Sequence, residues 1–267
     1  MFPNFVTLKN RNMLNTFFEY FKDKTESLLA FTLFCFVGGF ICLVVSKYST
    51  LQVAGISAWT KPFKFFISIG IFAFTMALYL VYLDNQKQVT NYCWSFILFF
   101  SIELFLITLQ ASRGRKSHYN IDTPLDRIIF ALMGLSLLII LIHTLFIITL
   151  FFSQKHFSTS DEMILAIKLS LLIMVVFMLE GYAMISFFKH TIGAEDSTEG
   201  IPILNWSKNY GDLRVAHFLG IHALQIIPFL TFVLANTKKE VYLISGLYFI
   251  FVTLTLAQAL QGKPFIK

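Results

Sequence analysis

Residues 128–152 read IIFALMGLSLLIILIHTLFIITLFF and contain no Asp, Glu, Lys or Arg. An apolar run longer than about 18 residues indicates a helix that crosses a lipid bilayer rather than the core of a water-soluble domain. A helix that rises about 1.5 Å per residue crosses a hydrocarbon layer about 30 Å thick within about 20 residues. The stretch therefore predicts a transmembrane helix.

The composition extends this prediction to the whole chain. Hydrophobic residues make up 57% of the 267 residues and charged residues 13%, whereas soluble domains carry about 25% charged residues. We therefore predict an all-α fold, a polytopic membrane helical bundle with about seven transmembrane helices in a single domain at residues 26–267. The predicted spans are residues 26–46, 62–83, 90–112, 125–152, 161–188, 213–235 and 240–262.

Residues 1–25 are too polar to span the bilayer. Within them, Leu14, Phe17, Phe18 and Phe21 follow the spacing of one apolar helix face. This pattern predicts an amphipathic helix in the headgroup layer, and the alternative is a helix packed on the bundle.

The net charge of +6 reflects Lys and Arg residues in short loops beside the spans, so we expect the lipid bilayer as partner and no nucleic acid. With seven spans, one side of the membrane carries 12 basic residues and the other 8, and Lys168 inside a span completes the 21. Because basic residues are enriched in cytoplasmic loops, this distribution places the C-terminus in the cytoplasm and the N-terminus outside.

Ten ionisable or amide side chains within the predicted spans are candidate functional residues. An ionised group in hydrocarbon costs at least about 2.5–3.5 kcal/mol, so each of these residues needs a structural or functional reason. Seven of the ten fall in the half of the bilayer assigned to the cytoplasm, which predicts an intramembrane polar pocket open to that face. The ten residues are Glu103, Gln110, His143, Lys168, Glu180, His217, His222, Gln225, Gln258 and Gln261.

The residue types in this set suggest roles. Glu103, Glu180, His217 and His222 are the candidate catalytic groups, because carboxylates and imidazoles exchange protons. The candidate cofactor ligands are His118, His217 and His222, with Glu103 as a fourth metal ligand, and the cofactor would be haem or a divalent metal ion. The remaining candidate pocket residues are Gln110, Arg113, Asn120, Asp212, Arg214, Gln225, Gln258 and Gln261.

Helical geometry and simpler alternatives limit these assignments. His217 and His222 are five residues apart, about 140° around a helix, so one regular helix does not readily present both to a single metal ion. Intramembrane Gln and His residues also serve as interhelical hydrogen-bonding groups, and Arg113 is most simply explained as a topology charge.

The stretch GDLRVAHFLGIHALQ at residues 211–225, together with WTKPFKF at residues 59–65, resembles uncharacterised bacterial multi-pass membrane proteins. The resemblance covers most of the chain. It implies a bacterial inner-membrane location, and it carries no activity, cofactor or site residue.

Three functions therefore stay open at this point. The first is a metal- or haem-dependent membrane enzyme acting on a small-molecule or lipid substrate. The second is a proton-coupled transporter or channel for a small solute, in which Glu103 and Glu180 titrate. The third is a non-catalytic membrane sensor or assembly factor that uses the same polar cluster to bind a partner.

Overall fold

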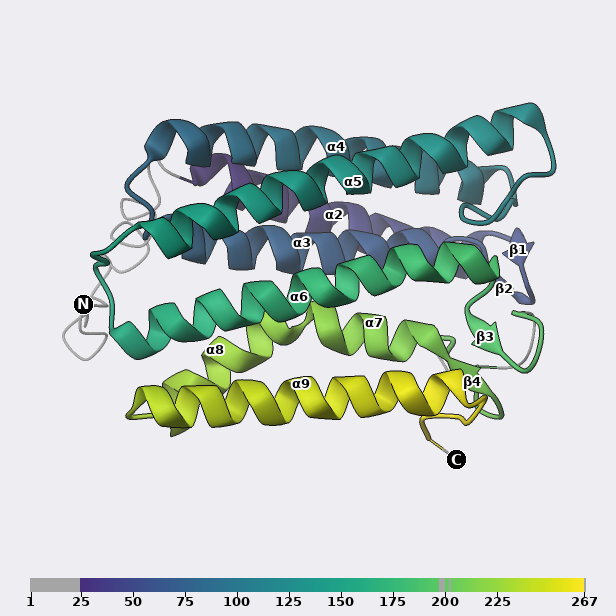
Figure 1. Cartoon of the computed structure of the whole chain (residues 1–267). Coiled ribbons are helices and arrows are strands. Elements are labelled where there is room, and N and C mark those ends of the chain that lie inside the picture. The colour runs from purple at the N-terminus through teal and green to yellow at the C-terminus, as the bar shows by residue number, and fades with distance from the viewer. Residues whose placement is uncertain (1–24, 197–199, 202, 267) are drawn as a thin grey trace. The chain divides into compact units, whose positions relative to one another are not determined.

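The computed structural model describes residues 25–196, 200–201 and 203–266, and helices dominate these parts of the chain (Figure 1). Its strands form two short two-stranded pairs. The all-α fold predicted from the sequence is therefore confirmed. The predicted amphipathic helix at residues 12–22 lies outside the described residues.

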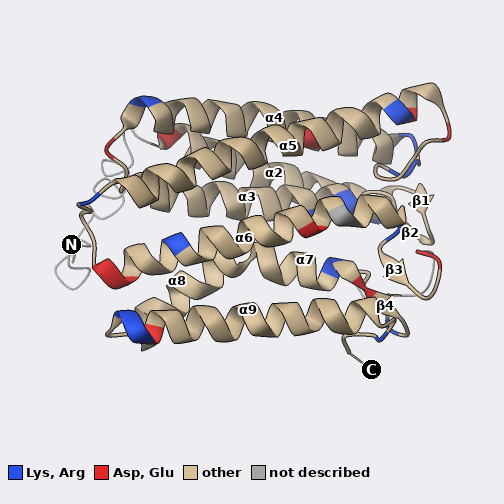
Figure 2. Ribbon diagram, in the orientation of Figure 1, with Lys and Arg blue, Asp and Glu red and all other residues tan. Residues whose placement is uncertain are grey.

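Within the described residues, six helices are long and apolar enough to cross a membrane, and a seventh span results if the bent pair α7–α8 counts as one. Lys, Arg, Asp and Glu gather mainly at helix ends and in connecting loops, and the middle parts of the helices are largely free of them (Figure 2). Large apolar side chains such as Phe40, Phe105 and Phe232 are 65–71% exposed. Surfaces of this kind are rare on soluble monomers but suit lipid contact, so the chain is an integral membrane protein.

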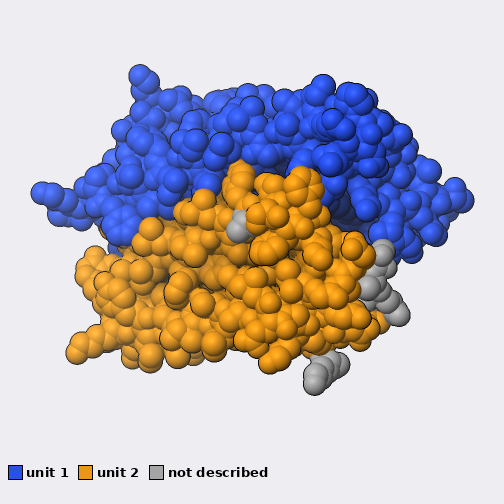
Figure 3. All heavy atoms as spheres, turned by 45° about the vertical axis from the view of Figure 1, so that its right-hand side comes forward, with its two compact units in different colours: residues 1–160 blue, residues 161–267 orange. Residues whose placement is uncertain are grey.

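The chain divides into two compact units, residues 1–160 and 161–267 (Figure 3). In unit 1, α2 (Glu26–Tyr48) and α3 (Thr60–Leu80) form a helical hairpin. The strands β1 (Gln52–Val53) and β2 (Ile56–Ser57) lie in the connection between these two helices. Gln52 pairs with Ser57 and Val53 with Ile56 in the antiparallel register. A second helical hairpin follows, formed by α4 (Gln86–Ser112) and α5 (Pro124–Ser153).

Glycines allow the two helices of the first hairpin to approach closely. A Cβ atom added at Gly38 would overlap the ring of Phe66, and one at Gly70 would lie 2.9 Å from the ring of Phe36. Small residues at such contacts are typical of membrane helices, which associate through packing rather than through the hydrophobic effect. The ring of Phe96 packs against Phe72 and Phe100, with centroid distances of 5.1 and 4.5 Å.

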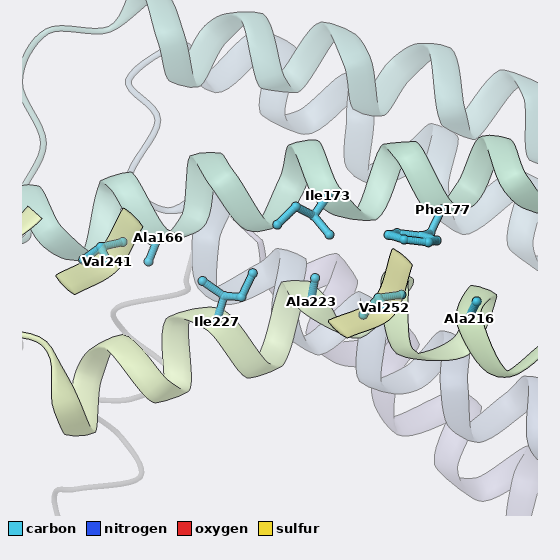
Figure 4. Packing of buried hydrophobic residues seen from close by; sticks show 8 residues of the cluster. All are labelled: Ala166, Ile173, Phe177, Ala216, Ala223, Ile227, Val241 and Val252. Carbon is cyan, nitrogen blue, oxygen red and sulfur yellow. The ribbon is translucent and has the colours of Figure 1, made fainter. Parts of the chain in front are cut away.

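Unit 2 contains α6 (Asp161–Phe187), α7 (Leu213–Ile221), α8 (Ala223–Leu234) and α9 (Lys238–Leu260). The connection after α6 is anchored by pairing of β3 (Thr191–Ile192) with β4 (Gly211–Asp212), in which Thr191 faces Asp212. All four helices contribute to one apolar core (Figure 4). Its buried members are Ala166, Ile173, Phe177, Ala216, Ala223, Ile227, Val241 and Val252.

Helix starts follow local capping chemistry. Thr123 accepts a hydrogen bond from the backbone N–H of Asp126 at the start of α5, as its place before Pro124 predicts. Thr237 and Glu240 form a complete capping box at α9. Asp212 caps α7 by accepting from the backbone N–H of Arg214.

The sixth predicted span, residues 213–235, differs from a regular helix. Its two parts, α7 and α8, are bent by 50° at His222. Because α7 rises roughly 13 Å over its length, the bend lies near the middle of a bilayer. Pro228 lies six residues beyond the bend, inside α8. Proline by itself therefore does not account for the position of the break.

Close packing of α7 on α6 depends on Gly220. A Cβ atom at this position would overlap the Phe177 ring, whereas one at Gly246 on α9 would meet nothing within 4 Å. We expect Gly220→Ala to lower the free energy of unfolding by about 1–3 kcal/mol through overpacking. Gly246→Ala serves as control, because an exposed helical Gly→Ala change is neutral or stabilises by up to about 1 kcal/mol. Denaturant titration in detergent, followed by circular dichroism, measures both, and equal stability of the two variants would contradict the packing argument.

Candidate functional site

The loop between α4 and α5 is fastened to a buried carboxylate in unit 1. The side chain of Asp126 is wholly buried. Its Oδ2 accepts hydrogen bonds from the Thr123 hydroxyl and from Arg115 Nη1, both at 2.6 Å. Its Oδ1 accepts from the Gln110 amide at 2.9 Å and from Arg113 Nη1 at 3.3 Å. Since a buried carboxylate is stable only when it is paired and hydrogen-bonded, this network fixes the path of the loop.

Three predicted pocket residues take part in building this loop. Gln110 also donates to the carbonyl of Lys116 at 3.2 Å, and Arg113 donates to the Gln110 amide oxygen at 2.6 Å. Asn120, only 3% exposed, donates to the same Lys116 carbonyl at 2.9 Å and accepts from the backbone N–H of Asp122. Asp126 was not among the site residues predicted from the sequence. The nearby run of basic residues was the signal that could have identified it as the centre of an ion-pair network.

Glu103 and His118 are brought together in the same unit. Glu103 lies nine residues before the end of α4, roughly 14 Å along the helix axis. Its side chain is 0% exposed, and within the described residues neither carboxylate oxygen has a hydrogen-bond partner. The His118 Nε2 atom lies 3.7 Å from Glu103 Oε1. The Lys61 ammonium on α3 is close enough for its charge to act on the same carboxylate.

The loop presents the His118 ring to Glu103. The hydroxyl of Ser117, itself only 4% exposed, lies 3.0 Å from His118 Nδ1. The ring also packs against Phe65 on α3 and Phe130 on α5, with centroid distances of 5.6 and 6.4 Å. His118 is therefore positioned by the loop and by aromatic contacts on two helices.

In unit 2, Asp212 and Arg214 form a bidentate ion pair at the start of α7. Arg214 Nε and Nη2 donate to the two carboxylate oxygens at 2.9 and 2.6 Å. Arg214 Nη2 also donates to the carbonyl of Asn205, and Asp212 accepts from the backbone N–H of Ser207. These two predicted pocket residues therefore secure the long connection between α6 and α7.

Glu180 and His217 form a second carboxylate–histidine pair. The His217 Nδ1 atom lies 2.7 Å from the carbonyl oxygen of Phe177 on α6. A carbonyl can only accept, so Nδ1 carries the hydrogen and Nε2 is left to accept a proton. Glu180 Oε2 lies 3.3 Å from the same Nδ1. A Cβ atom at Gly181 would lie 2.6 Å from His217 Cε1, so the absent side chain makes room for the ring.

The break between α7 and α8 is beside this pair. His222 ends one helix and begins the next, and its Nδ1 lies 3.0 Å from the amide oxygen of Gln225. The carbonyl of Leu219 accepts a hydrogen bond from the Tyr248 hydroxyl on α9 at 2.7 Å. A backbone acceptor at the interrupted turn is therefore satisfied by another helix, as a non-polar environment requires.

The remaining predicted residues lie at the end of α9. Gln258 donates to the carbonyl of Pro264, and Gln261 caps the helix and accepts from the Lys263 ammonium at 2.8 Å. Both amides therefore tie the C-terminal segment to the helix that precedes it.

A further ion pair, which sequence reasoning missed, closes the turn after α6. His190 Nδ1 lies 2.8 Å from Asp196 Oδ2, and the backbone N–H groups of His190 and Thr191 donate to the same carboxylate. Burial acts to raise the pKa of the Asp196 carboxyl. The hydrogen bonds and the charge of His190 outweigh it, so this pKa lies well below its ordinary value.

The proposed metal ligands do not form a metal centre in the part of the chain that the structure describes, because no group of three or more His, Cys, Asp or Glu side chains is placed to hold an ion there. Instead, the structure pairs Glu103 with His118 and Glu180 with His217. Comparison with protein-family models, curated proteins and solved structures gives no match, so function must be argued from these two pairs.

The network around Asp126 leads to a stability prediction. We expect Asp126→Asn to lower the midpoint of thermal unfolding, because Arg113 and Arg115 lose the charge they face and Thr123 loses a charged acceptor. Asp161→Asn is the matched control. Its ion pair with Lys238 lies on the surface, with side chains 76% and 54% exposed, and such pairs contribute little. Differential scanning fluorimetry in detergent compares the two variants, and equal midpoints would argue against a structural role for the buried network.

Proposed function

We propose that this integral membrane protein is a proton-coupled carrier of a small solute, with Glu180 and His217 as its proton-binding pair. One observation carries the proposal: Glu180 Oε2 lies 3.3 Å from His217 Nδ1 inside a membrane-spanning segment, beside a break in the next span. Ionisable groups within spans are functional candidates by default, because their burial is costly.

The geometry of the pair provides a place for a proton to bind. Glu180 is 10% exposed at its side chain, and its Oε2 has no hydrogen-bond partner within the described residues. With a neutral imidazole, the pair carries one negative charge in a medium of low dielectric constant. A proton that binds at His217 Nε2 produces an imidazolium next to the carboxylate and cancels that charge. Binding a proton, or a cationic solute in its place, therefore lowers the electrostatic cost of the site.

The bend in the sixth span supports transport. Discontinuous helices near the bilayer midplane line the substrate and ion sites of many secondary transporters, where freed backbone groups and helix ends contact the cargo. Here α7 and α8 meet at His222 with a bend of 50°. At the interrupted turn of α7, the Tyr248 hydroxyl donates a single hydrogen bond to the carbonyl of Leu219. A contact of this kind can be exchanged for a solute group when the site is occupied.

The metal- or haem-dependent enzyme is kept as a second candidate on one observation. His217 Nδ1 faces a backbone carbonyl and His222 Nδ1 faces an amide oxygen, and among the described residues neither Nε2 has a hydrogen-bond partner. Histidines that bind a metal or haem iron are usually oriented in this way, with Nδ1–H on an oxygen acceptor. The carrier is preferred because it needs only the two residues that the structure pairs.

The carrier is tested with the full-length protein in proteoliposomes that enclose a pH-sensitive dye. Amino acids, organic acids, sugars and organic cations are added in turn, and the change in internal pH is recorded. We expect at least one of these classes to drive proton movement. Glu180→Gln should abolish it, because the uncharged amide no longer stabilises the imidazolium. Gly181→Ala should reduce it, because the added Cβ displaces the His217 ring.

Glu162→Gln is the matched control, since it makes the same substitution at the other end of α6. Proton movement that survives Glu180→Gln, or an absence of proton movement with every class of solute, would refute the carrier. A haem absorbance band in the purified protein that disappears in His217→Ala would favour the enzyme instead.

We further propose a bacterial inner-membrane location, which the resemblance implies, and, from the distribution of Lys and Arg, a cytoplasmic C-terminus and an outward-facing N-terminus. In that orientation, the end of α6 and the start of α7 lie on the cytoplasmic side. The Glu180–His217 pair would then exchange protons with the cytoplasm.

A further inference from the structure

The carboxylate of Glu103 differs from that of Asp126, the other buried charged group among the described residues of unit 1. The Glu103 side chain is 0% exposed, and within the described residues neither of its oxygens accepts a hydrogen bond. Leaving a buried ionised carboxylate without hydrogen bonds costs several kcal/mol. A group in this position is therefore stabilised when it takes up a proton.

A route for that proton leads through His118. Its Nε2 lies 3.7 Å from Glu103 Oε1, and its side chain is 19% exposed, whereas that of Glu103 is not exposed at all. One ring therefore connects the loop surface with the interior. The separation exceeds hydrogen-bond length, and a shift of the ring by roughly half an ångström brings the two atoms within reach.

The loop holds this ring independently of Glu103. Ser117 Oγ lies 3.0 Å from His118 Nδ1, and the loop itself is fixed by Asp126 through Arg113 and Arg115. The ring is thus prearranged next to the carboxylate. Prearranged donors and acceptors transfer protons with little reorganisation.

We propose that Glu103 and His118 form a proton-uptake site, in which His118 takes up protons at the loop and passes them to Glu103. The imidazole first binds a proton from water at one ring nitrogen. The resulting imidazolium then breaks its Nε2–H bond as the O–H bond at Glu103 Oε1 forms. The products are a neutral imidazole and a neutral carboxylic acid, so one proton has moved and the pair carries no charge. This site is separate from the Glu180–His217 pair and does not depend on the carrier assignment.

Other charges act on the same carboxylate. Lys61 on α3 acts on it with a positive charge, whereas His118 is the titratable group that the loop directs at it. From α5, Asp126 is already engaged with Arg113 and Arg115. The balance between Lys61 and the proton delivered by His118 therefore decides the state of Glu103.

Time-resolved infrared spectroscopy after a pH jump tests this site on the full-length protein in lipid nanodiscs. The carbonyl stretch of a protonated carboxyl group reports proton uptake. We expect a band that grows as the pH falls and is lost in Glu103→Gln. His118→Phe retains an aromatic ring against Phe65 and Phe130 but has no nitrogen. It should slow the appearance of the band about a hundredfold, a typical effect of a positioned acid–base group.

His156→Phe is the control, because it makes the same substitution at an exposed position in the loop after α5. The proposal is overturned if the band persists in Glu103→Gln. It is also overturned if no carboxyl band appears, because Glu103 then stays ionised beside Lys61. It is also overturned if His118→Phe takes up the proton as fast as the unaltered protein. Should Glu103→Gln fail to fold, the rate measured with His118→Phe still decides the role of His118.

Discussion

The constraint on which this structure depends is that hydrocarbon offers no water to satisfy a buried polar group, so every partner must come from the protein. Asp126 meets this requirement with donors from Thr123, Gln110 and two arginines. Asp212 meets it with its bidentate ion pair to Arg214. Each of these carboxylates lies at the start of a helix and accepts hydrogen bonds from residues of the connection that precedes this helix. Loop structure at the membrane surface therefore follows from the need to neutralise a buried charge.

The same constraint explains the glycine that lies against His217. Backbone carbonyls in a membrane helix can receive a side-chain donor only if that side chain comes very near the helix axis. Gly181 provides this access, so that the His217 ring reaches the carbonyl of Phe177. At the bend at His222, the backbone carbonyl of Leu219 needs a donor from another helix. The Tyr248 hydroxyl supplies that hydrogen bond. Small residues and a single hydroxyl thus let unit 2 hold a histidine and an interrupted helix within an apolar core.

The helices could be predicted from the sequence because long apolar runs and capping residues are local signals. Thr123 before Pro124 marks the start of α5, and Asp212 marks the start of α7, as the structure confirms. The bend in the sixth span could not be predicted in the same way. Residues 213–235 predict a single span despite their polar residues, and the Tyr248 contact that accompanies the bend comes from a helix later in the chain.

The candidate site was predictable in residue type but not in pairing. The sequence singled out Glu103, Glu180 and His217 because ionisable groups are costly in a membrane span. It singled out His118 as a candidate cofactor ligand. Which carboxylate meets which histidine depends on the rotation of each helix and on the loop path, and neither is encoded in local spacing. Gln258 and Gln261 show the reverse case. Their shared helix face suggested a pocket, yet the tail folds back and occupies them both.

The difference between Asp126 and Glu103 separates a structural carboxylate from a chemical one. Both are wholly buried in unit 1 and both lie near basic side chains. Asp126 is held by four donors, so protonation would break a network and its charge is fixed. Glu103 has no donor within hydrogen-bond distance among the described residues, so its two protonation states differ less in the contacts they make. Protonation of Glu103 therefore breaks no hydrogen bond and removes a buried charge, and both effects suit the proton uptake proposed for it. The lack of partners at Glu103, rather than its burial alone, is therefore the reason to assign it chemistry.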